Sequence, residues 1–434
     1  MKRLLFLSIA VGFLASPARA QQSRVLTLGD ALQTAREHHP QLRVAHAQTE
    51  VANARAGESL APLLPQVGGT ARYQRATSNY VPSPGSAGAR TPGSSSFDTV
   101  NSFNFGLSAN QLIYDFGQTT GKWDASKINA QAQRASETRS VQQVAFNLRA
   151  AYYNAAAARA LVKVAQDGLA NQEAHLMQAQ GFVRAGTQPE IALAQALTNR
   201  ATARVQLITA QNGYDVARAQ LNQAMGIEGS INYDVEAGGA EPVPGEEGST
   251  DDLVPLALKA RPDLLALAEQ VRAQEATISA TRGGYGPALG ASTALTDAGP
   301  ALDNMAWNWN VALTLTWQFF GGGITSQQVR EARATISVLR GQYEIQHQQI
   351  RLDLEQARLA VRAAKASEEA THEAVVNARE QLRLAEGRYQ AGVGNMIELG
   401  DSQVAMTTVA AQEVQAHFNL AIARASLLLA LGQP

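Results

Sequence analysis

The 434-residue sequence contains no cysteine, which excludes disulfides, thiol chemistry and a lipid-attached cysteine at an export site. Aromatic residues make up only 6% of the chain, and the formal net charge is −1. Such a balance excludes a nucleic-acid partner attracted by bulk electrostatics. Beyond the first twenty residues no apolar run is long enough for a transmembrane helix. Any part that enters a membrane is therefore expected to do so as β-strands.

The first twenty residues form a segment of their own. Lys2 and Arg3 precede the apolar run LLFLSIAVGFLA, which is too short to span a bilayer as a mature helix. The triplet Ala18-Arg19-Ala20 fits the small-x-small cleavage rule. We therefore predict a cleaved signal peptide at 1–20 and an exported protein that is not a lipoprotein. An uncleaved anchor is the alternative.

The remaining chain contains two tandem copies of one unit. Pro40 and Pro262 lie in matching segments, AREHHPQL and LKARPDL, at an offset of 262 − 40 = 222. The other matching pairs are Pro65/Pro287 at 222, Phe116-Gly117/Phe320-Gly321 at 204, and GFVRAGT (181–187)/GRYQAGV (387–393) and Gly226/Gly432 at 206. The drop from 222 to 204 assigns about 18 extra residues to the Pro/Gly/Ser-rich stretch 80–97, which we predict to be an exposed loop.

The repeat defines the predicted domains. They are a signal peptide (1–20), a first unit (21–235) with strands near 66–76 and 102–115 and a helical hairpin near 119–225, a linker (236–252), and a second unit (253–434) with strands near 288–296 and 306–319 and a helical hairpin near 324–431.

The longest predicted helices, 119–184 and 324–390, would each span about 100 Å at about 1.5 Å per residue. Their apolar positions form a narrow seam at near-heptad spacing, and polar residues occupy the remaining surface. This pattern suits the wall of a hollow tube. A long coiled coil is an equally good interpretation of these segments alone.

The segment MAWNWNVALTLTWQF (305–319) alternates between apolar and polar residues. Period-two alternation places the two sets on opposite faces of a strand. The apolar set has aromatic residues at both ends, as in a lipid-facing strand; its members are Trp307, Trp309, Val311, Leu313, Leu315 and Trp317. A half-buried soluble sheet is the alternative. Four strands cannot close a membrane barrel, which needs at least eight, so the chain is expected to close one by oligomerising. Two chains would give eight strands with little open lumen, and three would give twelve with room for a channel.

The chain resembles the TolC-like outer membrane efflux proteins over essentially its whole mature length. The resemblance rests on the duplication, the Pro-led helix before each first strand, the corners YDFG (114–117) and FFGGG (319–323), and the RAGT and QAGV turns. It implies a mainly α fold with a β-barrel part: a long α-helical barrel continuous with a 12-stranded transmembrane barrel shared by a homotrimer. It also implies outer-membrane lipid contact, a periplasmic adaptor and an inner-membrane pump.

The resemblance assigns roles to residues near the two helical turns. Glu398 and Asp401 match acidic residues that ring the periplasmic entrance, although acids in a first helical turn are also ordinary solvated charges. Tyr389 matches a tyrosine that holds the tip closed, but its acidic partner falls at Ala192 and an arginine falls at Gly394. The implied adaptor-contacting tips are Arg184, Ala185, Gly186, Thr187, Ala391, Gly392, Val393 and Gly394.

No constellation for catalysis, a cofactor or a metal is visible in the sequence. The seven histidines lack metal-ligand spacing, and the glycine-rich stretches lack a phosphate-loop lysine. We therefore predict no enzymatic activity. The leading hypothesis is the exit duct of a tripartite efflux or type I secretion system, gated at the periplasmic tip. The alternative is a non-conducting helical spacer or adhesion-type protein anchored in the outer membrane. The sequence does not identify the substrate, the pump or the adaptor.

Overall fold

The computed structural model describes residues 24–77, 97–229, 233–236 and 238–433. The predicted signal peptide and most of the predicted loop at 80–97 lie outside these residues. The elements are β1 (Arg24–Leu26), α1 (Leu28–His38), α2 (Pro40–Leu60), β2 (Gln66–Thr77), β3 (Thr99–Tyr114), α3 (Gln118–Arg184), α4 (Glu190–Met225), β4 (Tyr233–Val235), α5 (Thr250–Ala260), α6 (Pro262–Gly283), β5 (Ala288–Ala301), β6 (Asn304–Thr316), α7 (Ile324–Gln390) and α8 (Met396–Ala430), with a short 3-10 turn at Ala61–Leu63.

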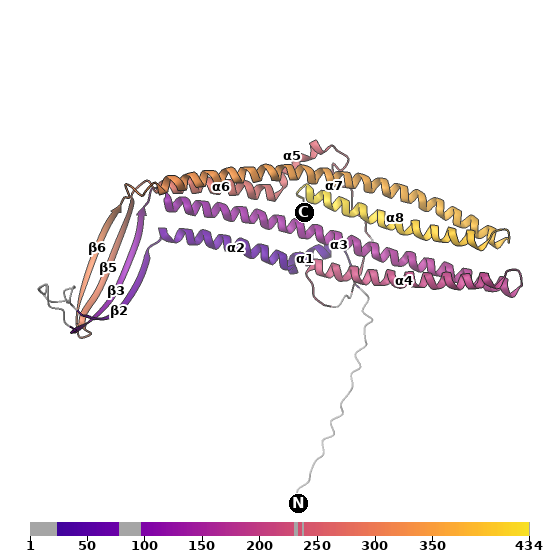
Figure 1. Cartoon of the computed structure of the whole chain (residues 1–434), viewed down its shortest axis with the longest axis horizontal. Coiled ribbons are helices and arrows are strands. Elements are labelled where there is room, and N and C mark those ends of the chain that lie inside the picture. The colour runs from indigo at the N-terminus through magenta and orange to yellow at the C-terminus, as the bar shows by residue number, and fades with distance from the viewer. Residues whose placement is uncertain (1–23, 78–96, 230–232, 237, 434) are drawn as a thin grey trace, which may run out of the picture. The chain divides into compact units, whose positions relative to one another are not determined.

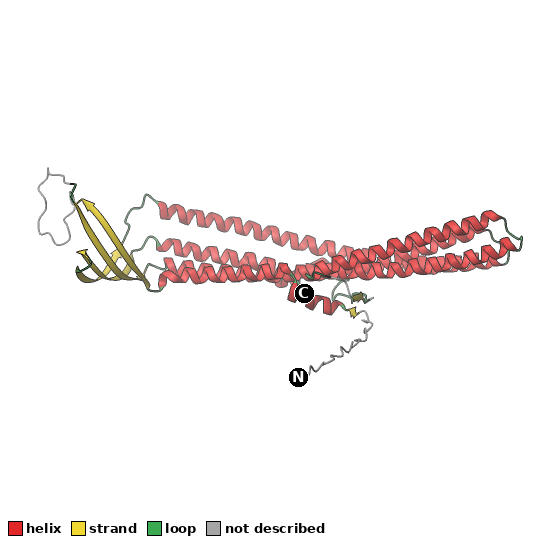
Figure 2. Cartoon of the chain, turned by 90° about the horizontal axis from the view of Figure 1, so that it is seen from below, coloured by secondary structure: helices red, strands yellow, loops and turns green. Residues whose placement is uncertain are grey.

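Most of the described residues are helical, as expected (Figure 2). The helices and strands fall into two compact units that cut across both repeats. Unit 1 contains the described residues up to His38, Leu148–Gly239 and Ala370–Phe418, and unit 2 contains His39–Asn147, Ala240–Glu369 and the residues from Asn419 onward. None of the described helices is both long and apolar enough to cross a membrane.

In unit 2, α2 lies beside α3 and α6 lies beside α7 (Figure 1). Proline at the first position of α2 and of α6 starts each shorter helix, because its missing N–H would be unpaired there in any case. The side chains of Ser59 and Ser126 join the first pair at 2.8 Å, and Gln274 donates to the carbonyl of Ala332 in the second. Many of the buried residues along these helices are alanines, which allow close helix packing.

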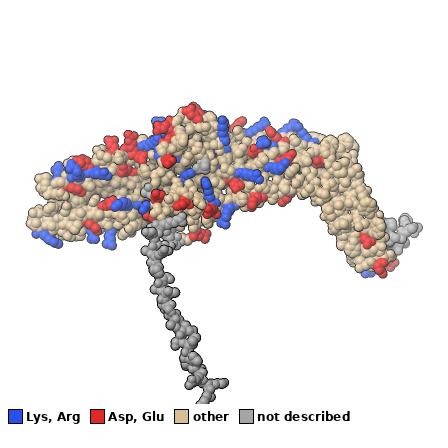
Figure 3. All heavy atoms as spheres, turned by 180° about the vertical axis from the view of Figure 1, so that it is seen from behind, with Lys and Arg blue, Asp and Glu red and all other residues tan. Residues whose placement is uncertain are grey.

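Unit 2 also contains a four-stranded sheet in the order β2-β3-β5-β6, with each pair antiparallel. The register gives the sheet one apolar face and one polar face. The mainly apolar face carries Val67, Tyr73, Phe103, Phe105, Leu107, Leu295, Trp307, Trp309, Val311, Leu313 and Leu315, with Arg75, Thr293 and Asp297 among them, and the polar face carries Gln66, Thr70, Arg72, Gln74, Ser102, Asn104, Ser108, Asn110, Ser292, Thr296, Asn308, Asn310, Thr314 and Thr316. On the side shown in Figure 3 the sheet surface is nearly free of charge, whereas the helices carry many charges.

The strand bounds differ from the predicted ones. β3 begins at Thr99 rather than 102, and β5 continues to Ala301 rather than 296, because hairpin pairing carries both strands past their apolar stretches. β6 ends at Thr316, so Trp317 lies just beyond the strand. Trp317 donates a hydrogen bond from its ring N–H to the carbonyl of Tyr285 at 3.1 Å.

The strand-to-helix corners correct the repeat offset that we read from the sequence. Phe116 and Gly117 both have positive φ, 53° and 81°, immediately before α3. The residues with the same conformation before α7 are Gly322 and Gly323, at 65° and 80°. The corner offset is therefore 322 − 116 = 206, and the match to Phe320-Gly321 at 204 is wrong. The identical Phe-Gly pairs suggested the wrong alignment because the left-handed position held by Phe116 in the first copy is held by Gly322 in the second. Glycine adopts that conformation more readily than phenylalanine does.

The stretch predicted as a linker is packed in part against the helices of unit 2. Val243 is buried in the core formed with α5, α7 and α8. The buried Glu246 carboxylate accepts a hydrogen bond from Arg424 at 3.0 Å and pairs with Lys365 at 2.7 Å. Although burial opposes ionisation, these bonds lower the pKa of Glu246 to about 2.

Unit 1 contains a small parallel pair, β1 and β4, held against α3. The Tyr152 hydroxyl donates to the carbonyl of Leu26 at 3.2 Å, and Arg159 bonds the carbonyl of Val235 and the carboxylate of Asp234. The ends of α3 and α7 and the starts of α4 and α8 belong to the same unit. Unit 1 therefore holds both helical turns to which site residues were assigned.

Candidate functional site

The two helical turns have the same backbone geometry. After α3, Thr187 N–H donates to Phe182 O and Gly186 N–H donates to Val183 O, both at 3.0 Å. After α7, Val393 N–H donates to Arg388 O at 3.0 Å and Gly392 N–H donates to Tyr389 O at 3.1 Å. These bonds are two Schellman motifs, and each requires the left-handed residue that glycine supplies, at φ 71° and 74°.

The turn after α7 is further fixed by Gly394 and Asn395. A Cβ at position 394 would lie 2.9 Å from the backbone nitrogen of Tyr389, so only glycine fits there. The Asn395 side chain accepts from Glu398 N–H at 2.7 Å and caps α8. The absence of the arginine that the resemblance implies at 394 thus has a steric reason.

Most of the predicted tip residues are exposed. Exposed are Arg184, Ala185, Gly186, Thr187, Ala391, Gly392 and Val393, whereas Gly394 is half-buried. Three apolar side chains at the tips are also exposed to solvent: Ile191, Val393 and Ile397 are each more than 70% exposed. A surface of this kind suits contact with another protein.

Tyr389 is buried inside the tip of unit 1. Only 1% of the residue is exposed, and its ring meets Phe182 edge-on at 5.7 Å. It packs with Ala385 and Leu399. Its hydroxyl has no hydrogen-bond partner among the described residues, and burial raises the pKa of Tyr389. Ala192, at the position of the implied acidic partner, is itself buried and apolar.

The buried hydroxyl leads to a prediction for two variants of Tyr389. Tyr389→Phe should leave the tip as stable as before, because the hydroxyl makes no bond that phenylalanine would lose. Tyr389→Ala should destabilise the tip by about 3–4 kcal/mol through the cavity it leaves. Hydrogen exchange at 385–395 measures both, and we expect local exchange several hundred-fold faster in the alanine variant only. Faster exchange in Tyr389→Phe would mean that the hydroxyl has a partner in the assembly.

Glu398 and Asp401 lie three residues apart in the first turns of α8. Asp401 is exposed, and Glu398 is half-exposed with its carboxylate 3.6 Å from the Arg388 guanidinium. An exposed pair of this length contributes little to stability. Both carboxylates therefore remain available to a cation in solution.

A polar contact between the hairpins of unit 1 has no signal in the sequence. Gln172 on α3 donates to the side chain of Gln403 on α8 at 2.7 Å, and the Gln403 amide nitrogen is buried without a partner among the described residues. The side chains of Gln172 and Gln403 border a small hollow together with Gly168, Gly400 and Thr407. Two glutamines 231 residues apart cannot be matched from a single sequence.

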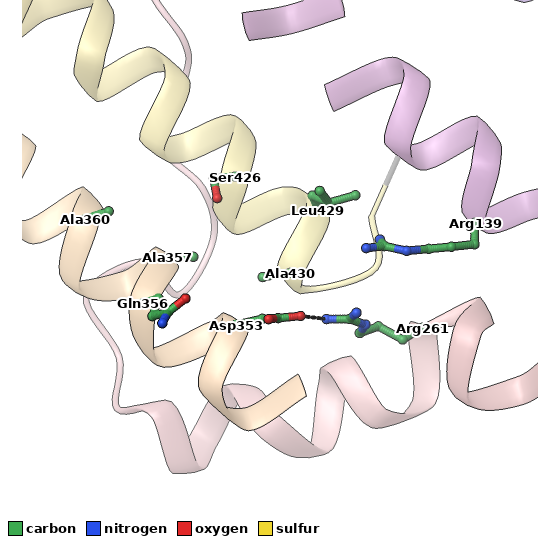
Figure 4. A pocket seen from close by; sticks show the side chains of 9 residues that line it. All are labelled: Arg139, Arg261, Asp353, Gln356, Ala357, Ala360, Ser426, Leu429 and Ala430. Carbon is green, nitrogen blue, oxygen red and sulfur yellow. Dashed lines mark hydrogen bonds and ion pairs between the residues drawn. The ribbon is translucent and has the colours of Figure 1, made fainter. Parts of the chain in front are cut away.

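A second polar cluster that the sequence did not reveal lies in unit 2 (Figure 4). Arg261 is 3% exposed and joins the α5–α6 junction to α7: it donates to Asp353 at 2.7 Å and to Asp263 at 2.5 Å. Although burial favours the neutral form, these bonds raise the pKa of Arg261. Arg139 of α3 points into a hollow that Arg261 and Asp353 also line, and its Nη1 is buried and unpartnered among the described residues. The charges balance, which marks the cluster as a structural joint.

The apolar face of the sheet has the features of a membrane surface. Leu313 and Val311 are more than 60% exposed in the isolated chain. Trp309 satisfies its ring N–H by donating to the Thr293 hydroxyl at 2.9 Å on the same face. Aromatic rings cluster at both ends of the sheet, in the contacts Tyr73–Phe103 at one end and Tyr114–Phe116 and Trp317–Phe319 at the other.

Among the described residues, no group of three or more His, Asp or Glu side chains could hold a metal ion. The features that stand out are an amphipathic four-stranded sheet, long helical hairpins and two matched tips. Together they define the class of outer membrane channel proteins with a helical extension.

The chain belongs to the outer membrane efflux protein family, whose family model matches residues 31–227 and 253–433. This family is a channel and transport family. The chain is 25% identical to the outer membrane protein TolC of Escherichia coli over 459 residues, covering 100% of this chain and 87% of that protein. It is 24% identical to the outer membrane efflux protein BepC of Brucella suis over 338 residues, covering 76% and 72%.

Solved structures of the same fold include two outer membrane channels. The Campylobacter jejuni CmeC channel superposes with a TM-score of 0.79 at 18% identity, over 93% of this chain and 85% of that one. The open state of the Neisseria gonorrhoeae MtrE channel superposes with a TM-score of 0.76 at 21% identity, over 94% and 89%. These superpositions agree with the mainly α fold, tandem repeat and β-barrel part expected from the sequence.

Proposed function

We propose that the protein is the outer membrane exit duct of a tripartite efflux or type I secretion system and that it works as a homotrimer. One observation carries this proposal: the sheet has an apolar face, a polar face and two unpaired edge strands, β2 and β6. A membrane leaves no water to bond an open edge, so the sheet must close with other copies. Three chains supply 3 × 4 = 12 strands, enough for a wet lumen.

In this proposal, transport through the lumen is passive, and a partner pump supplies the energy. The exposed tip residues, with Ile191, Val393 and Ile397 beside them, would meet a periplasmic adaptor that joins the duct to an inner-membrane pump. Residues 1–20 would direct export as a cleaved signal peptide. Because the chain has no cysteine, the strands rather than a lipid would hold it in the outer membrane.

Native mass spectrometry of the full-length protein, extracted from outer membranes in mild detergent, tests the assembly. We expect three copies per particle. A stable monomer, or any number of copies other than three, would contradict the twelve-stranded barrel. The same preparation shows by its N-terminal peptide whether cleavage occurs at Ala20.

The entrance role of Glu398 and Asp401 leads to a separate prediction. Three chains would bring about six carboxylates to the axis, and such a ring binds cations and slows their passage. In planar bilayers, a trivalent cation added on the helical side should block the current. Glu398→Gln/Asp401→Asn should raise the blocking concentration about tenfold or more, while Glu190→Gln, an exposed acid on α4, should leave it unchanged. Unchanged block in the double variant would remove both residues from the entrance.

A further inference from the structure

The two edge strands of the sheet can be matched to each other through the internal repeat. β3 and β5 pair inside one chain, and they are the second strand of the first copy and the first strand of the second copy. β6 and β2 stand in the same relation between one chain and the next. We propose that β6 of one copy pairs with β2 of the next copy in the register of the β3–β5 pair, which places Leu315 opposite Ala71 and Leu313 opposite Tyr73. This proposal rests on the proposed trimeric barrel.

The equivalence of the strands is fixed by the two hairpins together with the Pro65/Pro287 match, because the hairpin registers set the sum of the two strand offsets at 604 − 176 = 428. Gln66 pairs with Asn110 in the first hairpin, and Ala288 pairs with Thr316 in the second. The first strands differ by 288 − 66 = 222 and the second strands by 316 − 110 = 206. The offset of 222 is that of Pro65 and Pro287, and the offset of 206 is that of the strand-to-helix corners.

Helix starts give the same answer independently. α3 begins at Gln118 and α7 at Ile324, again 206 apart. The two copies therefore keep the same offset of 206 from their second strands to the ends of their helical hairpins. The first copy differs only by 222 − 206 = 16 additional residues in the loop between its strands.

Applying these offsets to the internal pair gives the seam between copies. Ala109 lies opposite Thr293 inside one chain. The equivalent residues at the seam are 109 + 206 = 315 and 293 − 222 = 71, so Leu315 lies opposite Ala71. Leu107 faces Leu295, which becomes 313 opposite 73. Asn110 faces Ser292, which becomes Thr316 opposite Thr70 on the polar face.

The chemistry of the resulting seam is self-consistent. The mainly apolar sides of both strands meet on one face, where Arg75 falls opposite Val311, and the polar Thr316–Thr70 pair lies on the other, as the alternation of strand side chains requires. Large side chains of β6 meet small ones of β2: Leu315 lies over Ala71, and Trp317 lies over Gly69. Covering an edge glycine with an aromatic ring stabilises strand pairs. Trp317 and Gln318, which follow β6 in the single chain, would continue the strand when its partner is present.

The match of Phe116-Gly117 to Phe320-Gly321 would define a competing register. An offset of 204 for the second strands would place 109 + 204 = 313, and hence Leu313, opposite Ala71. The two registers keep the same faces and differ by a slip of two residues, about 7 Å along a strand. Hydrophobicity alone does not separate them, so the proposal depends on the geometry of the hairpins and corners.

Disulfide trapping distinguishes the registers cleanly, because the chain has no cysteine of its own. Directly opposed residues come within reach of a disulfide, whereas a two-residue slip does not. Two pairs test the proposed register: Ala71→Cys/Leu315→Cys on the apolar face and Thr70→Cys/Thr316→Cys on the polar face. Ala71→Cys/Leu313→Cys tests the competing one. The proteins are oxidised in outer membranes and run on a denaturing gel without reductant.

We expect reductant-sensitive covalent trimers from at least one of the first two pairs, at several times the yield of the Ala71/Leu313 pair. Covalent trimers mainly from the Ala71/Leu313 pair would overturn the register. So would the absence of covalent trimers from all three pairs while native mass spectrometry still counts three copies. Neither result would contradict the trimer. Particles without three copies would overturn the proposed function itself. The two failures are therefore separate.

Discussion

Leu313→Arg is expected to remove most of the trimer from the outer membrane. Leu313 lies in the middle of the apolar face of β6, with 67% of the residue exposed in the isolated chain. An arginine in the central part of a lipid-facing strand costs about 2–4 kcal/mol, and every trimer would carry three. The measurement is the amount of trimer in purified outer membranes, by gel and by native mass spectrometry.

Asn310→Arg is the matched control for this variant. Asn310 lies three residues earlier on the same strand and on the polar face, opposite Ala294. An arginine there would face water in the lumen, so trimer yield should stay within about twofold of the natural protein. Equal loss in both variants, or in neither, would mean that the two faces of the sheet have been assigned wrongly.

Arg261→Met should produce the second large effect, a loss of stability in the helical part of unit 2. Removing the guanidinium leaves two carboxylates, Asp263 and Asp353, with a single remaining cation, Arg139, which lies 3.8 Å from Asp263. Breaking a buried pair costs about 3–5 kcal/mol, and we expect the lower end because Asp353 keeps 28% of its side chain exposed. The melting temperature of the detergent-solubilised protein should fall by several degrees.

The control for this prediction adds Asp353→Asn to Arg261→Met. This double variant leaves Asp263 beside Arg139, whose guanidinium lies 3.8 Å away, so it buries no uncompensated charge and should regain much of the lost melting temperature. Rescue identifies electrostatics as the cause, since lost side-chain packing would persist. A double variant as unstable as Arg261→Met alone would contradict the role of the ion pair.

The parts of the fold that depend on local rules could be predicted from the sequence. Alternation in WNWNVALTLT predicted the faces of β6. The matching RAGT and QAGV stretches were predicted to be turns, and Gly186 and Gly392 take the left-handed conformation in them. The strand ends were less accurate, because hairpin pairing extends β3 and β5 beyond their apolar residues. The corner offset was wrong because Phe116 takes a conformation that the second copy gives to Gly322.

The contacts within the candidate sites depended on distant residues and could not be predicted. The bond between Arg261 and Asp353 and that between Gln172 and Gln403 join positions 92 and 231 apart. Neither position carries a local pattern, since arginine and glutamine are common on exposed helix faces. The burial of Tyr389 also depends on Phe182 from another helix. Predicting the entrance residues required the family resemblance, and their role stays a proposal.

Whether this chain forms a conducting duct or a closed spacer is tested most directly by single-channel recording in planar bilayers, on trimers whose three copies have been counted by native mass spectrometry. We expect discrete ion conductance, larger in Tyr389→Ala, whose tip packing is loosened, than in the natural protein. Intact trimers that insert but conduct no ions, with or without that change, would contradict the duct and favour a spacer.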